Sequence, residues 1–232
     1  MCIRDSVNPS NNLWVGIAKK IPAGTSAKMI IDKYISAIGG LDKVKSITDL
    51  SQTMAGSIQG TEVVMNLKQK IAGKYMQTVN IPAAKETAFK IIVNGDSIWA
   101  YQYGQQIELP EDSKASYRAK TAIFPELSLN VSKLILAPEL VAIGESLAYQ
   151  VTQEGVDSIK IERFYDEKSG LKLKENVIRP GVTNFVEFSD YRNIAQGVLL
   201  PYNKRSDLGG YQIEYKMKEL KANSGLTDDS FK

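Results

Sequence analysis

The stretch "KMIIDKYISAIGG", residues 28–40, decides how the fold is interpreted. Its apolar residues recur with the spacing of one broad face of an α-helix, at Met29, Ile30, Ile31, Tyr34, Ile35 and Ile38. Thr25 or Ser26 can cap the start, and the glycines at 39 and 40 offer the left-handed backbone that ends a helix. The stretch therefore predicts an amphipathic helix over residues 28–38, whose apolar face needs a partner.

Most of the chain after this helix has the pattern of strands and turns. Segment 61–70 alternates apolar with polar residues, and Asn94-Gly95 is a tight-turn signal between two further strands. Successive strands joined this way pair antiparallel, and a sheet of about eleven strands twists and curls strongly. A polar interruption over residues 110–135 predicts a second, inserted helical region. The predicted fold class is mainly β (α+β): a curved, half-open antiparallel β-barrel of about eleven strands, with helices covering its concave face.

Composition argues against several classes of function. The 232 residues carry 29 basic and 26 acidic side chains, a net charge of +3, and the basic residues are scattered, so no nucleic-acid partner is expected. Histidine is absent, which removes Ser-His-Asp triads and HExxH zinc sites. Cys2 is the one cysteine, and phosphate-loop and GxGxxG motifs are missing. We expect no catalytic residues, no metal and no cofactor, and hence no enzyme in this chain.

The N-terminal segment differs from the rest. "MCIRDS" resembles a translated adapter remnant, and the polar, turn-rich residues that follow resemble a linker. No apolar stretch precedes Cys2, as a signal peptide would require. We therefore expect residues 1–24 to be a remnant and linker, the true N-terminus to be missing, and residues 25–232 to form one incomplete β-barrel domain.

Four segments together resemble a known group of proteins: "IIDKYISAIGGLDKVKSI", "YDEKSGLKLKE", "FSDYRNIAQGVLLPY" and "KMKELKANSGLTDDSF". Their order within the strand meander is similar to that of bacterial outer-membrane lipoprotein-sorting proteins of the LolA-like and LppX-like fold, over residues 25–232. That resemblance implies a half-open barrel plugged by helices. It also implies a lipid or acylated lipoprotein as partner, and a periplasmic or outer-membrane-associated location in a Gram-negative bacterium.

A second resemblance concerns the context of the domain. The entry "AKKIPAGTSAKMIIDKYISAIGG" is similar to C-terminal extensions of periplasmic insulinase-like zinc peptidases. The two resemblances imply two functions from different classes. The first is a non-catalytic binding domain for an apolar ligand, such as a lipid or a lipoprotein acyl chain. The alternative is an accessory domain that packs on an upstream peptidase domain of the same polypeptide, without a ligand of its own.

A covered apolar cavity would need deformable apolar side chains, because methionines and aromatics adapt to irregular ligands. The candidate lining residues are Ile35, Ile38, Met54, Ile58, Val63, Met65, Leu67, Met76, Trp99, Tyr101, Phe185 and Phe188. The face of two strands is ambiguous, so Tyr75 or Ile98 is an alternative inward residue. If the helix over 28–38 is a lid on such a cavity, truncating Ile35 or Ile38 should destabilise the protein by less than a core substitution does.

Overall fold

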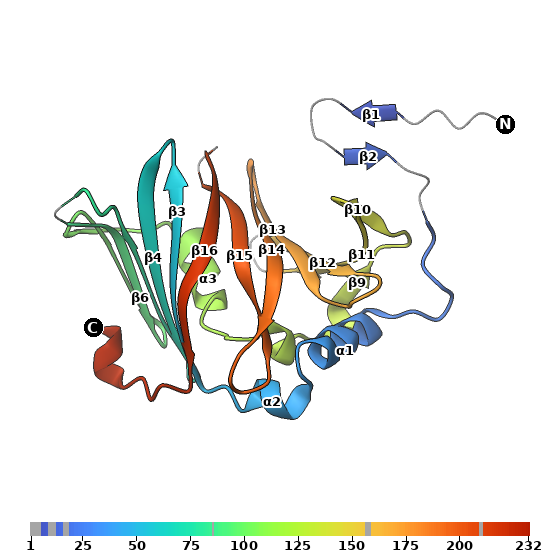
Figure 1. Cartoon of the computed structure of the whole chain (residues 1–232), viewed down its shortest axis with the longest axis horizontal. Coiled ribbons are helices and arrows are strands. Elements are labelled where there is room, and N and C mark those ends of the chain that lie inside the picture. The colour runs from blue at the N-terminus through green and yellow to red at the C-terminus, as the bar shows by residue number, and fades with distance from the viewer. Residues whose placement is uncertain (1–5, 9–12, 16–18, 85, 156–158, 209–210) are drawn as a thin grey trace. The chain divides into compact units, whose positions relative to one another are not determined.

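The structure is a computed structural model that describes residues 6–8, 13–15, 19–84, 86–155, 159–208 and 211–232. It is mainly β, and its main sheet is open and antiparallel with 14 strands (Figure 1). The expected count of about eleven strands is therefore not confirmed. Part of the difference is β9 (Leu134–Leu136), which lies in the segment expected to be helical. Strands of three residues are too short to show an alternating pattern.

The chain divides into two compact units. Unit 1 comprises Met1–Ile38 and Asn130–Phe188, and unit 2 comprises Gly39–Leu129 and Ser189–Lys232. Strand β14 (Val182–Asn193) begins in unit 1 and ends in unit 2. The expectation of one domain over residues 25–232 stays a prediction, and residues 1–5 of the expected adapter remnant lie outside the described part of the chain.

The first unit contains the helix that the opening stretch predicts. α1 (Ala27–Ala37) is capped by the Ser26 side chain, which accepts a hydrogen bond from the Met29 backbone N–H. Its apolar face is buried except for Met29, which is exposed, and its Tyr34 ring lies 5.3 Å from that of Tyr165, centroid to centroid. Lys33 also donates to the carbonyl of Glu167 at 2.6 Å. The predicted helix is thus confirmed, and these contacts fix it within unit 1.

The rest of unit 1 is an antiparallel set of strands with one short helix. Its strands pair in the order β10-β11-β12-β13-β14, and β9 pairs with β11. The bounds are η2 (Val131–Lys133), β10 (Val141–Ile143), β11 (Ser146–Glu154), β12 (Lys160–Asp166) and β13 (Lys172–Arg179). A separate pair, β1 (Ser6–Asn8) and β2 (Leu13–Val15), lies at the N-terminal end.

Unit 2 carries eight antiparallel strands in the order β15-β16-β3-β4-β5-β6-β7-β8 (Figure 1). Their bounds are β3 (Asp49–Ile58), β4 (Thr61–Lys70), β5 (Lys74–Asn80), β6 (Thr87–Asn94), β7 (Ser97–Gln102), β8 (Gln105–Ile107), β15 (Leu199–Leu208) and β16 (Tyr211–Ala222). The helices are α2 (Leu41–Lys45), α3 (Glu111–Ala119), η1 (Pro125–Ser128) and η3 (Asp228–Phe231). The inserted helical region is confirmed by α3, η1 and η2.

The two faces of the unit 2 sheet differ in character. One face carries two apolar clusters, built around Met54 and Ile213 and around Tyr75 and Ile91, and we call it the core face. The other face receives the C-terminal segment, since η3 contacts β5 and β6. The buried Asp49 carboxylate holds the start of that segment by accepting hydrogen bonds from Ser224, Gly225 and Leu226. Tyr117 of α3 packs against the second cluster on the core face, so both faces of this part of the sheet are covered.

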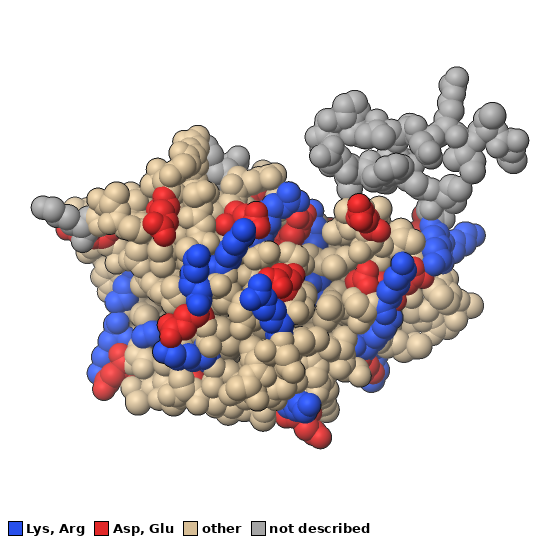
Figure 2. Space-filling view, viewed as in Figure 1, with Lys and Arg blue, Asp and Glu red and all other residues tan. Residues whose placement is uncertain are grey.

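The described residues contain no helix that is both long and apolar enough to cross a membrane. Acidic and basic side chains are interspersed on the face shown in Figure 2, and neither sign gathers into a continuous field. This distribution matches the scattered charges of the sequence.

Candidate functional site

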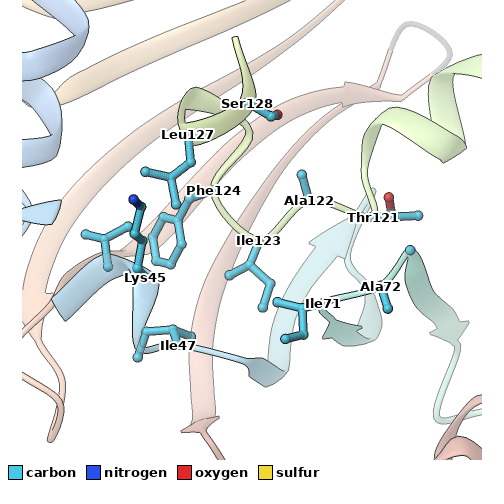
Figure 3. Close-up of a pocket in the computed structure, with 12 residues that line it drawn as sticks. Lys45, Ile47, Ile71, Ala72, Thr121, Ala122, Ile123, Phe124, Leu127 and Ser128 are labelled. Carbon is cyan, nitrogen blue, oxygen red and sulfur yellow. The ribbon is translucent and has the colours of Figure 1, made fainter. Parts of the chain in front are cut away.

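An apolar groove of about 430 Å³ lies at one end of the unit 2 sheet (Figure 3). Three segments far apart in the sequence form it: α2 with the residues that follow it, the β4–β5 turn, and the loop after α3. Eight of its twelve lining residues are apolar, namely Val44, Ile47, Ile71, Ala72, Ala122, Ile123, Phe124 and Leu127. The other four are Lys45, Gly73, Thr121 and Ser128. Its volume falls in the range of about 300–1,000 Å³ that is typical of small-molecule sites.

The β4–β5 turn places Ile71 at the rim of the groove. Ala72 and Gly73 both have positive φ, 70° and 76°, so the chain turns sharply directly after Ile71, whose backbone N–H donates to the Thr48 carbonyl. The Ile71 side chain is 55 % exposed, although a large aliphatic group gains free energy by burial. Leu127, on the opposite wall, is 39 % exposed. Two large aliphatic side chains thus face solvent across one groove.

Gln69 holds the loop wall of the groove in place. Its amide nitrogen Nε2 donates to the Lys120 carbonyl at 2.8 Å and to the Ala122 carbonyl at 3.3 Å. The side chain is only 8 % exposed, and a buried amide is costly unless it is hydrogen-bonded. These bonds therefore fix the loop segment that includes Thr121 to the end of β4.

Lys45 is the one ionisable residue among the twelve that line the groove. Figure 3 shows it beside Phe124 and Leu127, across the groove from Ala72. The hydroxyl groups of the lining are held by their own loops: Thr121 donates to the Arg118 carbonyl and Ser128 to the Pro125 carbonyl. The groove is therefore apolar along most of its length, with one cation at one end.

Five of the residues predicted to line a cavity lie on the core face of unit 2. Met54 and Val63 are buried in one cluster, with Ile58 and Met65 packed against it. Leu67 packs against the second cluster. The structure thus brings Met54, Ile58, Val63 and Met65 together, as the alternation along the strands predicts. Their ligand-binding role stays a prediction.

Three predicted residues lie on the opposite face of the same sheet. Met76 is paired with Ile92, and Ile92 with Trp99, and directly paired residues point to the same face. Tyr101 shares that face because it alternates with Trp99. Tyr75 and Ile98, the alternatives that the sequence left open, are the residues on the core face.

The remaining four predicted residues belong to unit 1. Ile35 and Ile38 lie at the buried face of α1, and Ile38 has no exposed surface. Phe185 and Phe188 lie three positions apart in β14, so they point to opposite faces of the strand. Each ring has a lysine over it: Lys174 lies 4.7 Å from the Phe185 ring centroid and Lys172 lies 5.1 Å from that of Phe188.

The groove residues were missed because sequence carries no distances between α2, the β4–β5 turn and the loop after α3. Two local signals could have indicated them. Ile71 is a large apolar residue inside the polar turn "KQKIAGK", and "AIFPEL" places three large apolar side chains around a proline in the inserted region. Apolar residues in turns and loops are unusual enough to suggest a surface with a function.

The buried titratable groups of the core face do not form a reactive site. Burial, with a further contribution from Tyr117, raises the pKa of Tyr75 far above its ordinary value. Its hydroxyl donates to Gln77 Oε1 at 2.5 Å. Burial likewise raises the pKa of Tyr215, so both phenols stay neutral. Within the described ranges, no three acidic or cysteine residues gather as a metal site would require. A second depression, over β3 and β16, is lined mainly by polar residues.

Comparison with known proteins identifies the fold. No protein-family model and no curated protein matches the chain. Among solved structures, a LolA superfamily protein from Nitrosomonas europaea superposes with a TM-score of 0.56 at 13% identity, covering 90% of this chain and 98% of that one. A protein described as an outer membrane lipoprotein-sorting protein domain, from Vibrio parahaemolyticus, gives 0.57 at 13% identity, with 89% and 97% covered.

Neither neighbour is described as part of a peptidase, so the accessory-domain alternative gains no support. Identities this low establish shared architecture and nothing finer. The agreement extends over nearly the whole length of both neighbours, and it matches the resemblance seen in the sequence. The chain therefore has a LolA-like fold.

Proposed function

We propose that this protein is a non-catalytic binding protein for an apolar ligand, and that it holds an acyl chain of a lipid or lipoprotein in the groove. One observation carries the proposal: an open apolar groove of about 430 Å³ that keeps Ile71 and Leu127 in contact with solvent. An acyl chain between these side chains would remove both from water.

The expected affinity is modest, which suits a carrier that must release its load. Each methylene group that leaves water contributes about 0.8 kcal/mol, and association costs offset several of these contributions. A single acyl chain of about 14 carbons enters a bilayer with an association constant of only about 10⁴ M⁻¹. A groove open along one side should bind in a similar, reversible range.

The ligand path can extend from the groove along the core face. Strand β4 ends at the groove, and going back along it the residues of the core face are Gln69, Leu67 and Met65. We propose that the predicted residues Met54, Ile58, Val63, Met65 and Leu67 form the apolar layer beneath the deeper end of a bound chain. Gln69 lies between this layer and the groove and is hydrogen-bonded to the loop wall, so a bound chain would reach the layer only where those bonds open.

No reaction is proposed for this site, since binding and release of an acyl chain require no bond to break. We propose a periplasmic or outer-membrane-associated location in a Gram-negative bacterium. The proposed partner is a lipid or an acylated lipoprotein. The LolA-like fold supports this proposal, because one of the similar solved structures is described as a lipoprotein-sorting protein domain.

The test is displacement of a neutral fluorescent probe, N-phenylnaphthylamine, by a long-chain alcohol. We expect the wild-type protein to take up the probe and Ile71→Asp to lose most of that uptake, because a carboxylate in the groove is costly to desolvate. The matched control is Ile135→Asp, since Ile135 is 52 % exposed in β9 but does not line the groove. Equal uptake by both variants and the wild type would contradict the proposal.

A further inference from the structure

The groove is asymmetric in charge as well as in shape. Lys45 lies at one end, beside Phe124 and Leu127, and none of the twelve lining residues is acidic (Figure 3). An apolar ligand without charge would need no cation there. This asymmetry would suit a ligand that carries a group of opposite sign at one end.

The ammonium group of Lys45 is available to a ligand. Lys45 is exposed, and within the described ranges no ion pair involves it. By contrast, Lys70 and Lys74, which flank the β4–β5 turn, both lie within ion-pair distance of Asp228. Three acidic residues lie near the groove in sequence, and one of them, Asp49, is buried and accepts hydrogen bonds from the C-terminal segment. Asp42 is exposed one turn earlier in α2, and Glu126 is buried with an interaction of its own.

The lysine side chain suits an amphiphile because it is itself amphipathic. Its methylene stem can cover an apolar wall while the ammonium remains in water. Resting on Phe124 and Leu127, the Lys45 stem would extend the groove by its own length. The ammonium would then meet the head of a chain whose tail points toward Ile71.

We propose that the groove selects anionic amphiphiles, in which a single acyl chain ends in a carboxylate or phosphate group that pairs with Lys45. This inference rests on the proposed function, because it specifies the head group of the same ligand. A fatty acid and a lipid with a phosphate head present the same chemistry to the lysine.

The experiment compares ligands that share one chain length and differ in the head group. Dodecanoate, dodecyl phosphate and 1-dodecanol compete with bound N-phenylnaphthylamine at mildly alkaline pH. An exposed ion pair predicts that the two anions displace the probe at roughly two- to fivefold lower concentration than the alcohol. The preference should shrink as salt is added, because salt screens exposed charges.

The variants locate the head group. Lys45→Gln should abolish the preference for anions, so that dodecanoate, dodecyl phosphate and 1-dodecanol displace the probe from this variant at similar concentrations. Lys43→Gln is the matched control, since Lys43 lies in the same helix but does not line the groove. If dodecanoate and dodecyl phosphate differ, the stronger competitor distinguishes a fatty-acid head from a phosphate head.

Two further results distinguish failure of the head-group assignment from failure of the proposed function. The head-group assignment would be wrong if anions and alcohol displaced the probe equally from the wild type, or if the preference for anions survived in Lys45→Gln. Neither result would contradict binding of an apolar ligand in the groove. Failure of every ligand to displace the probe, with Leu127→Asp and Leu147→Asp indistinguishable from the wild type, would overturn the proposed function itself. Leu147 is 37 % exposed in β11 and serves as the matched control.

Discussion

Replacing Gln69 with leucine should loosen the wall of the groove. The side chain donates to the carbonyls of Lys120 and Ala122, and leucine is of similar size but can donate to neither. Each intramolecular hydrogen bond contributes about 0.5–1.5 kcal/mol net, so the loss is about 1–3 kcal/mol. Burial of the leucine side chain offsets part of that loss. We expect Gln69→Leu to lower the free energy of unfolding by about 1–2 kcal/mol.

Thermal unfolding and amide hydrogen exchange together test this expectation. For a chain of this size, about 1 kcal/mol corresponds to a shift in Tm of about 2–4 °C. Exchange should also accelerate at the amides of residues 120–128, because this segment loses its attachment to β4. Gln106→Leu is the control, since Gln106 is exposed in β8 and a surface change costs less than about 0.5 kcal/mol. An unchanged Tm and unchanged exchange in Gln69→Leu would refute the role given to Gln69.

Three further predictions concern stability. Ile38→Ala should cost about 2–5 kcal/mol in a urea titration, because Ile38 has no exposed surface, whereas Met29→Ala, at a 55 % exposed position, should cost almost nothing; a loss below about 1 kcal/mol for Ile38 would instead favour the lid interpretation of α1. Asp49→Asn should release the C-terminal segment, so that limited proteolysis cuts residues 223–232 faster; equal cutting rates would contradict this. Burial opposes ionisation of Asp166, but hydrogen bonds from Ser169 and Lys168 hold the pKa of its carboxyl below its ordinary value. The stability that the ionised Asp166 contributes is therefore present above the unfolded pKa of about 3.9 and is lost as pH falls through the lower folded pKa. In Asp166→Asn the free energy of unfolding should fall less steeply with acid than in the wild type. Parallel curves of unfolding free energy against pH would refute this.

The sequence predicted those parts of the fold that depend on local patterns. The period of 3.6 in residues 28–38 located α1 to within one residue at each end, and the alternation in β4 correctly placed Val63, Met65 and Leu67 on one face. Glycine turns separated most strands. These signals depend on neighbouring residues, which sequence specifies directly.

Other features were beyond such patterns. In "SIWAYQY", the four consecutive residues from Ile98 to Tyr101 are apolar, so alternation could not predict which of them point to the core face. In the structure, packing against α3 on one face and the C-terminal segment on the other determines their orientation. The groove depends on tertiary distances between α2, a turn and a loop. Local patterns can indicate the helix, the turn and the loop one by one. Their proximity arises only when the sheet folds.

Photo-crosslinking tests the central claim most directly, because it reports where a bound acyl chain lies. The full chain is incubated with a fatty acid that carries a diazirine in its tail, irradiated, digested and mapped by mass spectrometry. A groove ligand predicts labelling in residues 44–47, 71–73 and 121–128, and loss of that labelling in Ile71→Asp but not in Ile135→Asp. Labelling confined to other segments, or labelling that Ile71→Asp leaves unchanged, would contradict the claim that the groove is the acyl-chain site.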